Sequence, residues 1–312
     1  MATGLLLVTN KGDRTLSLVD PATNRQIVAL PEDGVTGHEV AASLDGKRAF
    51  VPIFGDSGVG KAGTDGQLVR VFDLARRELV GTVDLGKGLR PHCAVVCQKT
   101  GLLYVTTEVE NSVTVIDPEK LAILGSIPTG KEQSHMLAVT RDGQRGYTAN
   151  VASGTVSVLD LPGRKLVKVI PVGRMVQRIS ISTDDRLAFT ADQFEPRIAV
   201  IDTQSNEVKT SVVLPDIGYG TAATPDGRYL VVALINLNEV GLIDLATMKL
   251  VKTIAVPRSP QAVLVRPDGL VAYVSCDASK QVVAINLAEW KVDALIDVGS
   301  GADGLAWSVG GS

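Results

Sequence analysis

The sequence predicts an all-β protein, a seven-bladed β-propeller with four-stranded blades that occupies residues 1–312 as a single domain. Three observations lead to this prediction. One strand pattern ending in Asp or Asn recurs seven times, Asp-Gly turns recur within the repeats, and the two ends of the chain match complementary parts of one blade. A chain of this length would otherwise suggest two domains, but the repeats run through it without a break.

The repeated strand ends at similar intervals along the chain. The spacing is 53 residues once and 42 to 44 residues thereafter, and the terminal residues are Asp20, Asp73, Asp117, Asp160, Asp202, Asp244 and Asn286. Four short strands and their turns occupy about 40 to 45 residues, which is the size of a propeller blade. Alternation with a period of two excludes a helical solenoid. The final Asp is expected to bond the backbone of the following turn, which is a structural role.

The fourth repeat shows the four strands of a blade. It reads as inner strand MLAVT, turn RDGQR, second strand GYTAN, loop VASG, third strand TVSVLD, turn LPGRK and outer strand LVKVIPV. The Asp-Gly pair in the first turn supplies the positive φ angle of a tight hairpin.

The first blade lacks an inner strand at its own start. The chain begins with the second strand LLLVTN, whereas residues 303–308, DGLAWS, match the inner strand HEVAAS at residues 38–43. The C-terminal strand is therefore expected to complete the first blade and close the ring, which removes free sheet edges.

The repeats resemble the YVTN-type β-propeller repeat family. The resemblance rests on strands such as VTVID and IAVID, on second strands such as LLYVTT and GYTAN, and on outer strands followed by Gly, as in VIPVG. It covers nearly the whole chain and implies the propeller fold. It leaves function open, because that family and its propeller relatives include surface proteins, binding modules, lactonases and metal enzymes.

Composition narrows the range of partners. The net charge is −3 with scattered Lys and Arg, so nucleic acid is not an expected partner. No run of 18 apolar residues is present, so no membrane association is expected. Three cysteines are too few for a disulfide framework and favour a reducing, cytoplasmic location. An exported protein whose signal had been removed would have the same sequence.

The three histidines of the chain share one position in three successive repeats. His38, His92 and His135 begin the inner strands of these repeats, and the other repeats carry Gln177, Tyr219, Gln261 and Asp303 there. Three converging imidazoles would hold a transition metal ion (Zn, Fe, Cu or Ni) and leave a coordination position open. The pattern therefore predicts a metal site at the mouth of the channel. The alternative is polar lining of a wet channel, since strand twist decides where the side chains point.

Further polar residues are expected on the same face. Glu108, Gln177, Arg178, Tyr219 and Asp303 are candidates for binding a substrate or orienting the metal ligands. The carboxylates of Glu110, Asp192 and Asp277 are weaker candidates, and Arg90 and Arg178 could bind an anionic group. Solvated loop charge is the alternative explanation. Cys93 and Met136 follow His92 and His135, and adjacent strand residues point to opposite faces, so both are expected to pack between blades.

A long glycine-rich loop, residues 55–67, follows the second strand of the second blade. Gly55–Lys61 reads G-x-x-x-x-G-K, but Ala62 stands where a phosphate loop needs Ser or Thr, and no helix pattern follows. A lid beside the histidines is the preferred interpretation.

The sequence leaves three classes of function. The first is a metal-dependent enzyme acting on a small-molecule ligand at the channel mouth, with the reaction type open. The second is a non-enzymatic interaction scaffold. The third is a lactonase-like hydrolase that uses a carboxylate-bound divalent ion.

Overall fold

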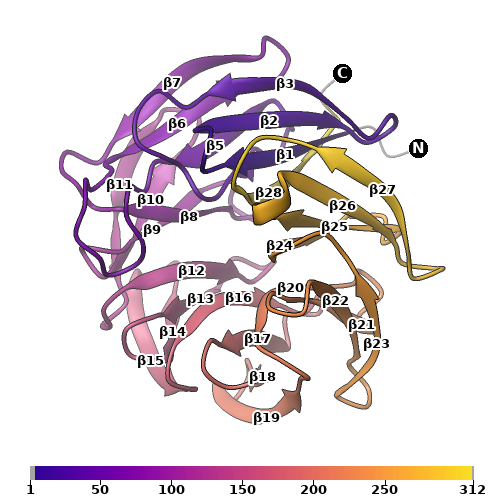
Figure 1. The fold of residues 1–312 in the computed structure, drawn as a ribbon. Coiled ribbons are helices and arrows are strands. Elements are labelled where there is room, and N and C mark those ends of the chain that lie inside the picture. The colour runs from indigo at the N-terminus through magenta and orange to yellow at the C-terminus, as the bar shows by residue number, and fades with distance from the viewer. Residues whose placement is uncertain (1–3, 311–312) are drawn as a thin grey trace.

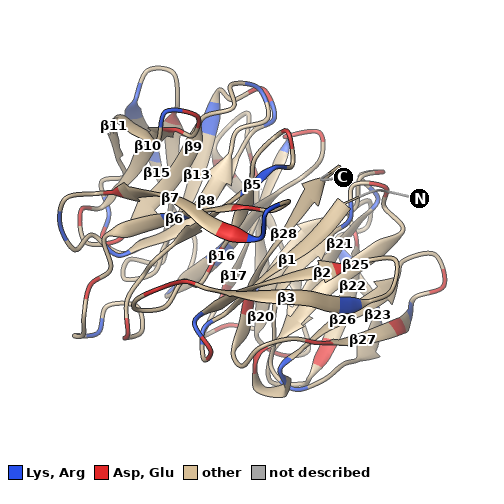
Figure 2. Ribbon diagram, turned by 90° about the horizontal axis from the view of Figure 1, so that it is seen from above, with Lys and Arg blue, Asp and Glu red and all other residues tan. Residues whose placement is uncertain are grey.

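A computed structural model describes residues 4–310, and these form seven four-stranded antiparallel sheets arranged in a ring (Figure 1). The predicted seven-bladed propeller is confirmed. No helix among the described residues is long and apolar enough to cross a membrane. Acidic and basic residues are interspersed over the loops and outer strands (Figure 2).

Each blade has its innermost strand at the channel and its outermost strand at the rim. From the inside outward, the first three blades are β28 (Ala302–Val309), β1 (Gly4–Asn10), β2 (Thr15–Asp20), β3 (Arg25–Pro31); β4 (Ala41–Ala42), β5 (Arg48–Pro52), β6 (Leu68–Asp73), β7 (Glu78–Asp84); and β8 (Pro91–Val96), β9 (Leu103–Thr107), β10 (Ser112–Asp117), β11 (Ala122–Pro128).

The remaining four blades keep the same order. They are β12 (Ser134–Val139), β13 (Arg145–Asn150), β14 (Thr155–Asp160), β15 (Lys165–Pro171); β16 (Val176–Ile181), β17 (Leu187–Asp192), β18 (Arg197–Asp202), β19 (Glu207–Val213); β20 (Gly218–Ala223), β21 (Tyr229–Leu234), β22 (Glu239–Asp244), β23 (Lys249–Ala255); and β24 (Pro260–Val265), β25 (Val271–Cys276), β26 (Gln281–Asn286), β27 (Lys291–Asp297). A short 3-10 turn, η1 (Asp277–Ser279), joins β25 to β26.

The Asp at the end of each third strand binds its own turn, as expected. In the first blade, for example, Asp20 Oδ1 accepts a hydrogen bond from the Ala22 N–H at 2.9 Å. In the second blade, Asp73 Oδ1 accepts bonds from the Ala75 and Arg76 N–H groups. This recurring residue therefore ends strands and takes no part in the channel.

Apolar side chains between adjacent sheets form the core. The largest fully buried side chains include Phe50, Phe72, Tyr147, Phe189 and Tyr273, from second and third strands of different blades. Each blade thus buries both faces against its neighbours, which leaves the channel and the loops as the places where polar side chains gather.

The C-terminal strand closes the ring. Strand β28 pairs antiparallel with β1, from Gly4 opposite Val309 to Asn10 opposite Ala302, so the predicted closure is confirmed. At the turn of the neighbouring blade, Gly46 has φ +70°, and a Cβ there would lie 1.6 Å from the Val309 carbonyl oxygen. The close approach of β28 therefore requires glycine at this turn.

One inner strand is shorter than predicted. Residues 38–43 were expected to form it, but only Ala41–Ala42 are paired as β4. The ladder is interrupted before β4, where Gly37 still bridges Ile53 and the carbonyl of His38 accepts a hydrogen bond from the Gly304 N–H of β28 at 2.9 Å. The regular ladder is thus lost where a histidine enters the channel.

Deleting residues 303–312 should destabilise the whole propeller. The deletion removes most of β28 and exposes the inner edge of β1, so we expect the Tm to fall by at least about 10 °C. Differential scanning calorimetry measures the change. Val309→Ala, at the half-exposed end of the same strand, is the control and should shift the Tm by about 1 °C or less. A truncated protein that melts with the parent would contradict the closure.

Candidate functional site

Seven side chains form a ring at one end of the channel. His92, His135, Gln177, Tyr219, Gln261 and Asp303 are the second residues of their inner strands, and His38 lies three residues before β4. The pairing register shifts at this point, for example between Pro91 and Ala94 in β8 and between Ser134 and Met136 in β12. Such bulges break the alternation of a strand and redirect its side chains.

The three histidine rings meet around Phe54, which lies two residues after the end of β5. The ring centroid of Phe54 lies 4.8 Å from that of His38, 5.2 Å from that of His92 and 5.9 Å from that of His135. The His92 and His135 rings are 3.5 Å apart and inclined by 30°, whereas His38 meets His92 edge-on at 5.3 Å. The shared repeat position therefore brings the three imidazoles together.

Two of the three rings, those of His92 and His135, are stacked, and His38 meets this pair edge-on. The lone pair of an imidazole nitrogen lies in the ring plane, so stacked rings direct their nitrogens side by side instead of at one point. Within residues 4–310, no group of three or more His, Cys, Asp or Glu side chains could hold a metal ion. The structure thus does not show the predicted three-histidine metal centre, because two of the imidazoles are stacked and the third meets them edge-on.

Burial keeps the three imidazoles neutral. Desolvation lowers the pKa of His38 to about 3, helped by the nearby Lys11 and opposed by Asp303. It also lowers the pKa of His92 and of His135, although Glu108 opposes the shift at His135. His92 and His135 are almost completely buried, whereas His38 is partly exposed. Neutral imidazole is the form that donates to a metal ion, and only His38 presents it to solvent.

Glu108 and Gln177 lie on opposite sides of the His135 ring. Glu108 Oε2 is 3.6 Å from His135 Nδ1, and Gln177 Nε2 is 3.4 Å from His135 Nε2. Burial raises the pKa of the Glu108 carboxyl, but its contacts with His135, with the Gly60 N–H and with Arg90 outweigh this effect and lower it. Both residues were expected beside the histidines, and the structure places them against one of the three rings.

The glycine-rich loop, residues 55–67, is fastened beside the histidines. Arg90 binds Asp65 through Nε and the Ser57 hydroxyl through Nη2 at 2.9 Å, and Glu108 Oε1 accepts the Gly60 N–H at 3.0 Å. The loop leads into β6 without a helix, and the Gly60 N–H that a phosphate would need is bonded to a carboxylate. Between the loop and the third blade lies a pocket of about 580 Å³, lined by Lys61, Arg90 and Glu108 among others.

An ion network spans the other half of the ring. Arg178 of β16 reaches across the channel to Glu39 and to Asp303, the latter at 2.7 Å, and its guanidinium lies 5.0 Å from the Tyr219 ring centroid. All three ionic side chains are at least nine-tenths buried. The Arg178 pKa is raised because the two carboxylates outweigh its desolvation.

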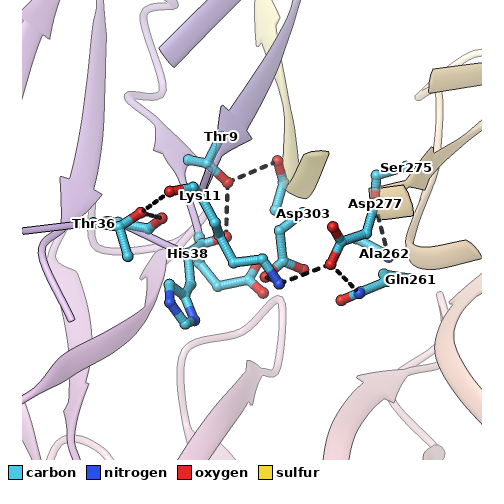
Figure 3. A network of polar contacts seen from close by, with 12 residues as sticks. Thr9, Lys11, Thr36, His38, Gln261, Ala262, Ser275, Asp277 and Asp303 are labelled. Carbon is cyan, nitrogen blue, oxygen red and sulfur yellow. Dashed lines mark hydrogen bonds and ion pairs between the residues drawn. The ribbon is translucent and has the colours of Figure 1, made fainter. Parts of the chain in front are cut away.

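Lys11 continues this network toward the seventh blade. Its Nζ lies 3.1 Å from Asp303 and 3.2 Å from Asp277, and Gln261 donates to Asp277 at 2.7 Å (Figure 3). Sequence reasoning missed Glu39 and Lys11. Glu39 directly follows a histidine of the ring, which was the only sequence signal for it.

Several candidates contact other groups of the chain itself. Arg178 and Arg90 were candidates for binding an anion, but both are paired with carboxylates of the chain itself. Glu110 pairs with Lys87 at 2.7 Å on the loop surface, and Asp192 accepts the Arg174 and Phe194 N–H groups. These carboxylates therefore hold loops in place.

Cys93 and Met136 are buried in one apolar cluster between blades, as expected. Burial, together with the charge of Glu39, raises the pKa of the Cys93 thiol to about 12, which keeps it protonated. Neither sulfur joins the histidine stack.

The fold and this ring define a propeller with neutral imidazoles on one side of a channel mouth and a buried ion network on the other. Residues 97–308, more than half of the chain, match the family model described as the cytochrome D1 heme domain. The chain belongs to this family. The match supports the propeller class that the repeats indicated, but the family shown is the cytochrome D1 heme domain and not the YVTN-type family that the repeats resemble.

Curated relatives cover part of the chain. The protein YncE of Escherichia coli strain K12 is 26% identical over 193 residues, which are 60% of this chain and 54% of that protein. Antigen Lp49 of Leptospira interrogans is 26% identical over 174 residues, or 53% of this chain and 37% of that protein. The chain thus spans about half the length, or less, of these relatives.

Two solved structures share the fold over most of the chain. Hydrazine synthase of Kuenenia stuttgartiensis superposes with a TM-score of 0.79 at 19% identity and covers 91% of this chain and 92% of that one. The dihydro-heme d1 dehydrogenase NirN in complex with DHE superposes with a TM-score of 0.69 at 15% identity, covering 96% and 74%. At these identities the likeness shows the fold alone.

Arg178→Met should strongly destabilise the protein. The variant leaves Glu39 buried without its cation and leaves Asp303 with Lys11 alone, and we expect a loss of about 3 to 5 kcal/mol in the free energy of unfolding at pH 7.5. Urea unfolding measures it. The triple variant Arg178→Met, Glu39→Gln and Asp303→Asn should recover most of the loss, because no buried charge then lacks a partner. A loss below about 1 kcal/mol in the single variant would show that the network is not structural.

A buried carboxyl precedes His38 and should make stability depend on pH. Glu32 is fully buried, Oε2 accepts the Gly37 N–H at 2.7 Å, and Oε1 has no partner within the described residues. Desolvation raises its pKa to about 7. The stabilising, protonated form is complete below the unfolded pKa of 4.5 and is lost as the pH rises to about 7.

Glu32→Gln should therefore change the free energy of unfolding differently at the two ends of this range. The change at pH 8 should be more stabilising than that at pH 4.5 by about 2 to 3 kcal/mol. Urea unfolding of parent and variant across this range measures the difference. Glu119→Gln, an exposed carboxyl, is the control and should show no such pH-dependent gain. Parallel pH profiles for the parent and Glu32→Gln would contradict the assignment.

Proposed function

We propose that this propeller binds an iron tetrapyrrole at the histidine end of the channel, with His38 as the axial donor to the iron. The observation that carries the proposal is that the His38 imidazole is both neutral and partly exposed. The other two imidazoles are neutral but buried. Membership of the cytochrome D1 heme domain family supports the choice of ligand class, and so does the fold shared with the dihydro-heme d1 dehydrogenase NirN.

The residues present fit a group that needs one imidazole. A three-imidazole site for a bare ion would require the three rings to converge, and two of the three are stacked, buried and in edge-on contact with Phe54. A tetrapyrrole supplies four nitrogen ligands of its own and needs one axial donor from the protein. In this proposal the tetrapyrrole brings the transition metal that the three histidines were expected to bind.

The other side chains of the ring would position the ligand. Gln177 and Tyr219 are partly exposed and offer an amide and a hydroxyl from the walls adjoining the histidines. Glu108 and Gln177 would orient the His135 ring, and Glu108 also fastens the loop at residues 55–67 beside the stacked pair. When bound, the iron would supply a redox-active centre, and this arrangement supports small-molecule binding with or without catalysis.

Titration with hemin tests the proposal. We expect saturable 1:1 binding with a shift of the Soret band, both in the oxidised protein and after reduction with dithionite. His38→Gly should abolish the shift, and about 10 mM imidazole should restore it by replacing the missing side chain. The melting curve of the variant establishes that it is folded.

Neither the control nor the contradicting results require a measurement of catalysis. Lys168→Ala, on the exposed outer strand of the fourth blade, should bind hemin like the parent. The proposal fails if the parent gives no Soret shift or if His38→Gly binds equally well. It also fails if the parent binds Zn²⁺ or Ni²⁺ stoichiometrically and loses it on His92→Ala, because the imidazoles would then form the bare-ion site.

A further inference from the structure

A second ring of seven residues surrounds the opposite mouth of the channel. In six blades it is the second residue after the end of the inner strand, within the first turn, and in the first blade it is the last residue of β28. In the second blade, for example, it follows Ser43, whose hydroxyl donates to Asp45, and in the fourth it follows Thr140, which donates to Asp142. From the first blade to the seventh the residues are Val309, Leu44, Gln98, Arg141, Thr183, Pro225 and Pro267.

The second ring is unlike the histidine ring in chemistry. It contains no carboxylate and one cation, whereas the histidine end contains Asp303, Asp277 and Glu39. The two rings are separated by the length of the inner strand: Asp303 and Val309 are six residues apart on β28, or about 20 Å. Arg178 lies across the channel near the histidine end, so the two mouths are separate sites.

A pocket of about 510 Å³ opens at this mouth. Five of the seven ring residues line it, and the complete lining is Ala42, Ser43, Leu44, Gln98, Arg141, Pro267, Trp307 and Val309. Its size lies within the range of small-molecule sites. The lining comes from five blades, so the pocket lies over the channel axis instead of between two blades.

Apolar groups of this lining are exposed. Leu44 is 40% exposed and Val309 is 46% exposed, and Trp307 is partly exposed with its ring parallel to that of Tyr273, 13° between planes and 6.2 Å between centroids. An exposed aromatic and two aliphatic side chains around one concavity favour a flat apolar ligand.

The charge of the lining favours a negatively charged ligand. Arg141 has no ion pair within residues 4–310, although its backbone N–H donates to Asp185 Oδ2 at 2.9 Å, and its guanidinium is the one charged group of the lining. The nearby turn carboxylates are engaged: Asp45 accepts from Ser43 Oγ and the Lys47 N–H, and Asp142 accepts from Thr140 Oγ1 and the Gln144 N–H. Arg141 is thus the group available to an anion.

We infer that the mouth opposite the histidines is a second binding site, which takes a small planar aromatic anion against Trp307 with its acidic group at Arg141. The apolar walls bind the ring system, and the guanidinium distinguishes an anion from a neutral molecule of the same shape. This site is independent of the iron tetrapyrrole proposal, since it uses no residue of the histidine ring.

A matched pair of fluorescent molecules tests the inference. 8-Anilinonaphthalene-1-sulfonate carries a sulfonate, and N-phenyl-1-naphthylamine is the same ring system without it. We expect saturable 1:1 binding of both to the parent. Arg141→Gln should weaken binding of the sulfonate about tenfold and that of the neutral amine less than about twofold.

Two further variants locate the site. Leu44→Asp should abolish binding of the sulfonate and weaken that of the amine, because it places a carboxylate in the apolar wall. Arg186→Gln, in the corresponding turn of the fifth blade but outside the lining, is the charge-matched control and should bind both molecules like the parent. Melting curves establish that all variants are folded.

Three outcomes would overturn the inference. The first is the absence of saturable binding of either molecule. The second is equal binding of the sulfonate to the parent, Arg141→Gln and Leu44→Asp, which would indicate nonspecific adsorption. The third is a concentration-dependent dimer that Leu44→Asp converts to monomer, as seen by analytical ultracentrifugation, because a second copy of the chain would then cover this mouth.

Discussion

The pairing of β28 with β1 is the interaction on which the rest of the structure depends. It joins the last strand of the chain to the first, completes the first blade and leaves the inner edge of β1 paired. It also brings Asp303 into the channel, where the carboxylate meets Arg178 and Lys11. Closure therefore fixes both the outer shape and the charges inside the channel.

Ion pairs inside the channel also connect its opposite walls. Arg178 belongs to the fifth blade, whereas Glu39 and Asp303 belong to the second and first, so its two ion pairs join opposite walls. A buried ion pair of this kind contributes little net stability, but removal of one member is costly, so it favours a single arrangement of the ring. The inner strands are thus held around the circumference by apolar packing between blades and across the channel by ionic side chains.

The repeats allowed the fold to be predicted, but only part of the site. A period of about 42 residues and a strand alternation are local properties, and they place a residue such as His135 on the inner strand without knowledge of the other blades. Contacts across the channel are not local: Arg178 and Glu39 are 139 positions apart, and nothing in either repeat specifies the partner. Phe54 was missed for a similar reason, because it follows a second strand and enters the ring from the side.

The failure of simple alternation has a structural cause. Adjacent residues of a regular strand point to opposite faces, which was correct for Cys93 and Met136 but not for Arg178, whose side chain enters the channel next to Gln177. The register of β16 shifts between Val176 and Ile179, so neither Gln177 nor Arg178 occupies a regular position. A bulge is not visible in residue spacing, since it changes the backbone pairing without changing the length of the repeat.

The separation of neutral and ionic groups follows from desolvation. Imidazoles in a buried cluster lose their protons because no carboxylate compensates three charges there, and Glu108 alone does not reverse the effect at His135. The buried charges gather instead where Arg178 and Lys11 face Asp303, which lowers the pKa of that carboxyl although burial opposes this. The same ring therefore provides uncharged nitrogen donors in the second to fourth blades and a nearly balanced set of ions elsewhere. A ligand centred at this mouth meets a donor on one side and fixed charges on the other, which defines the orientation in which it can bind.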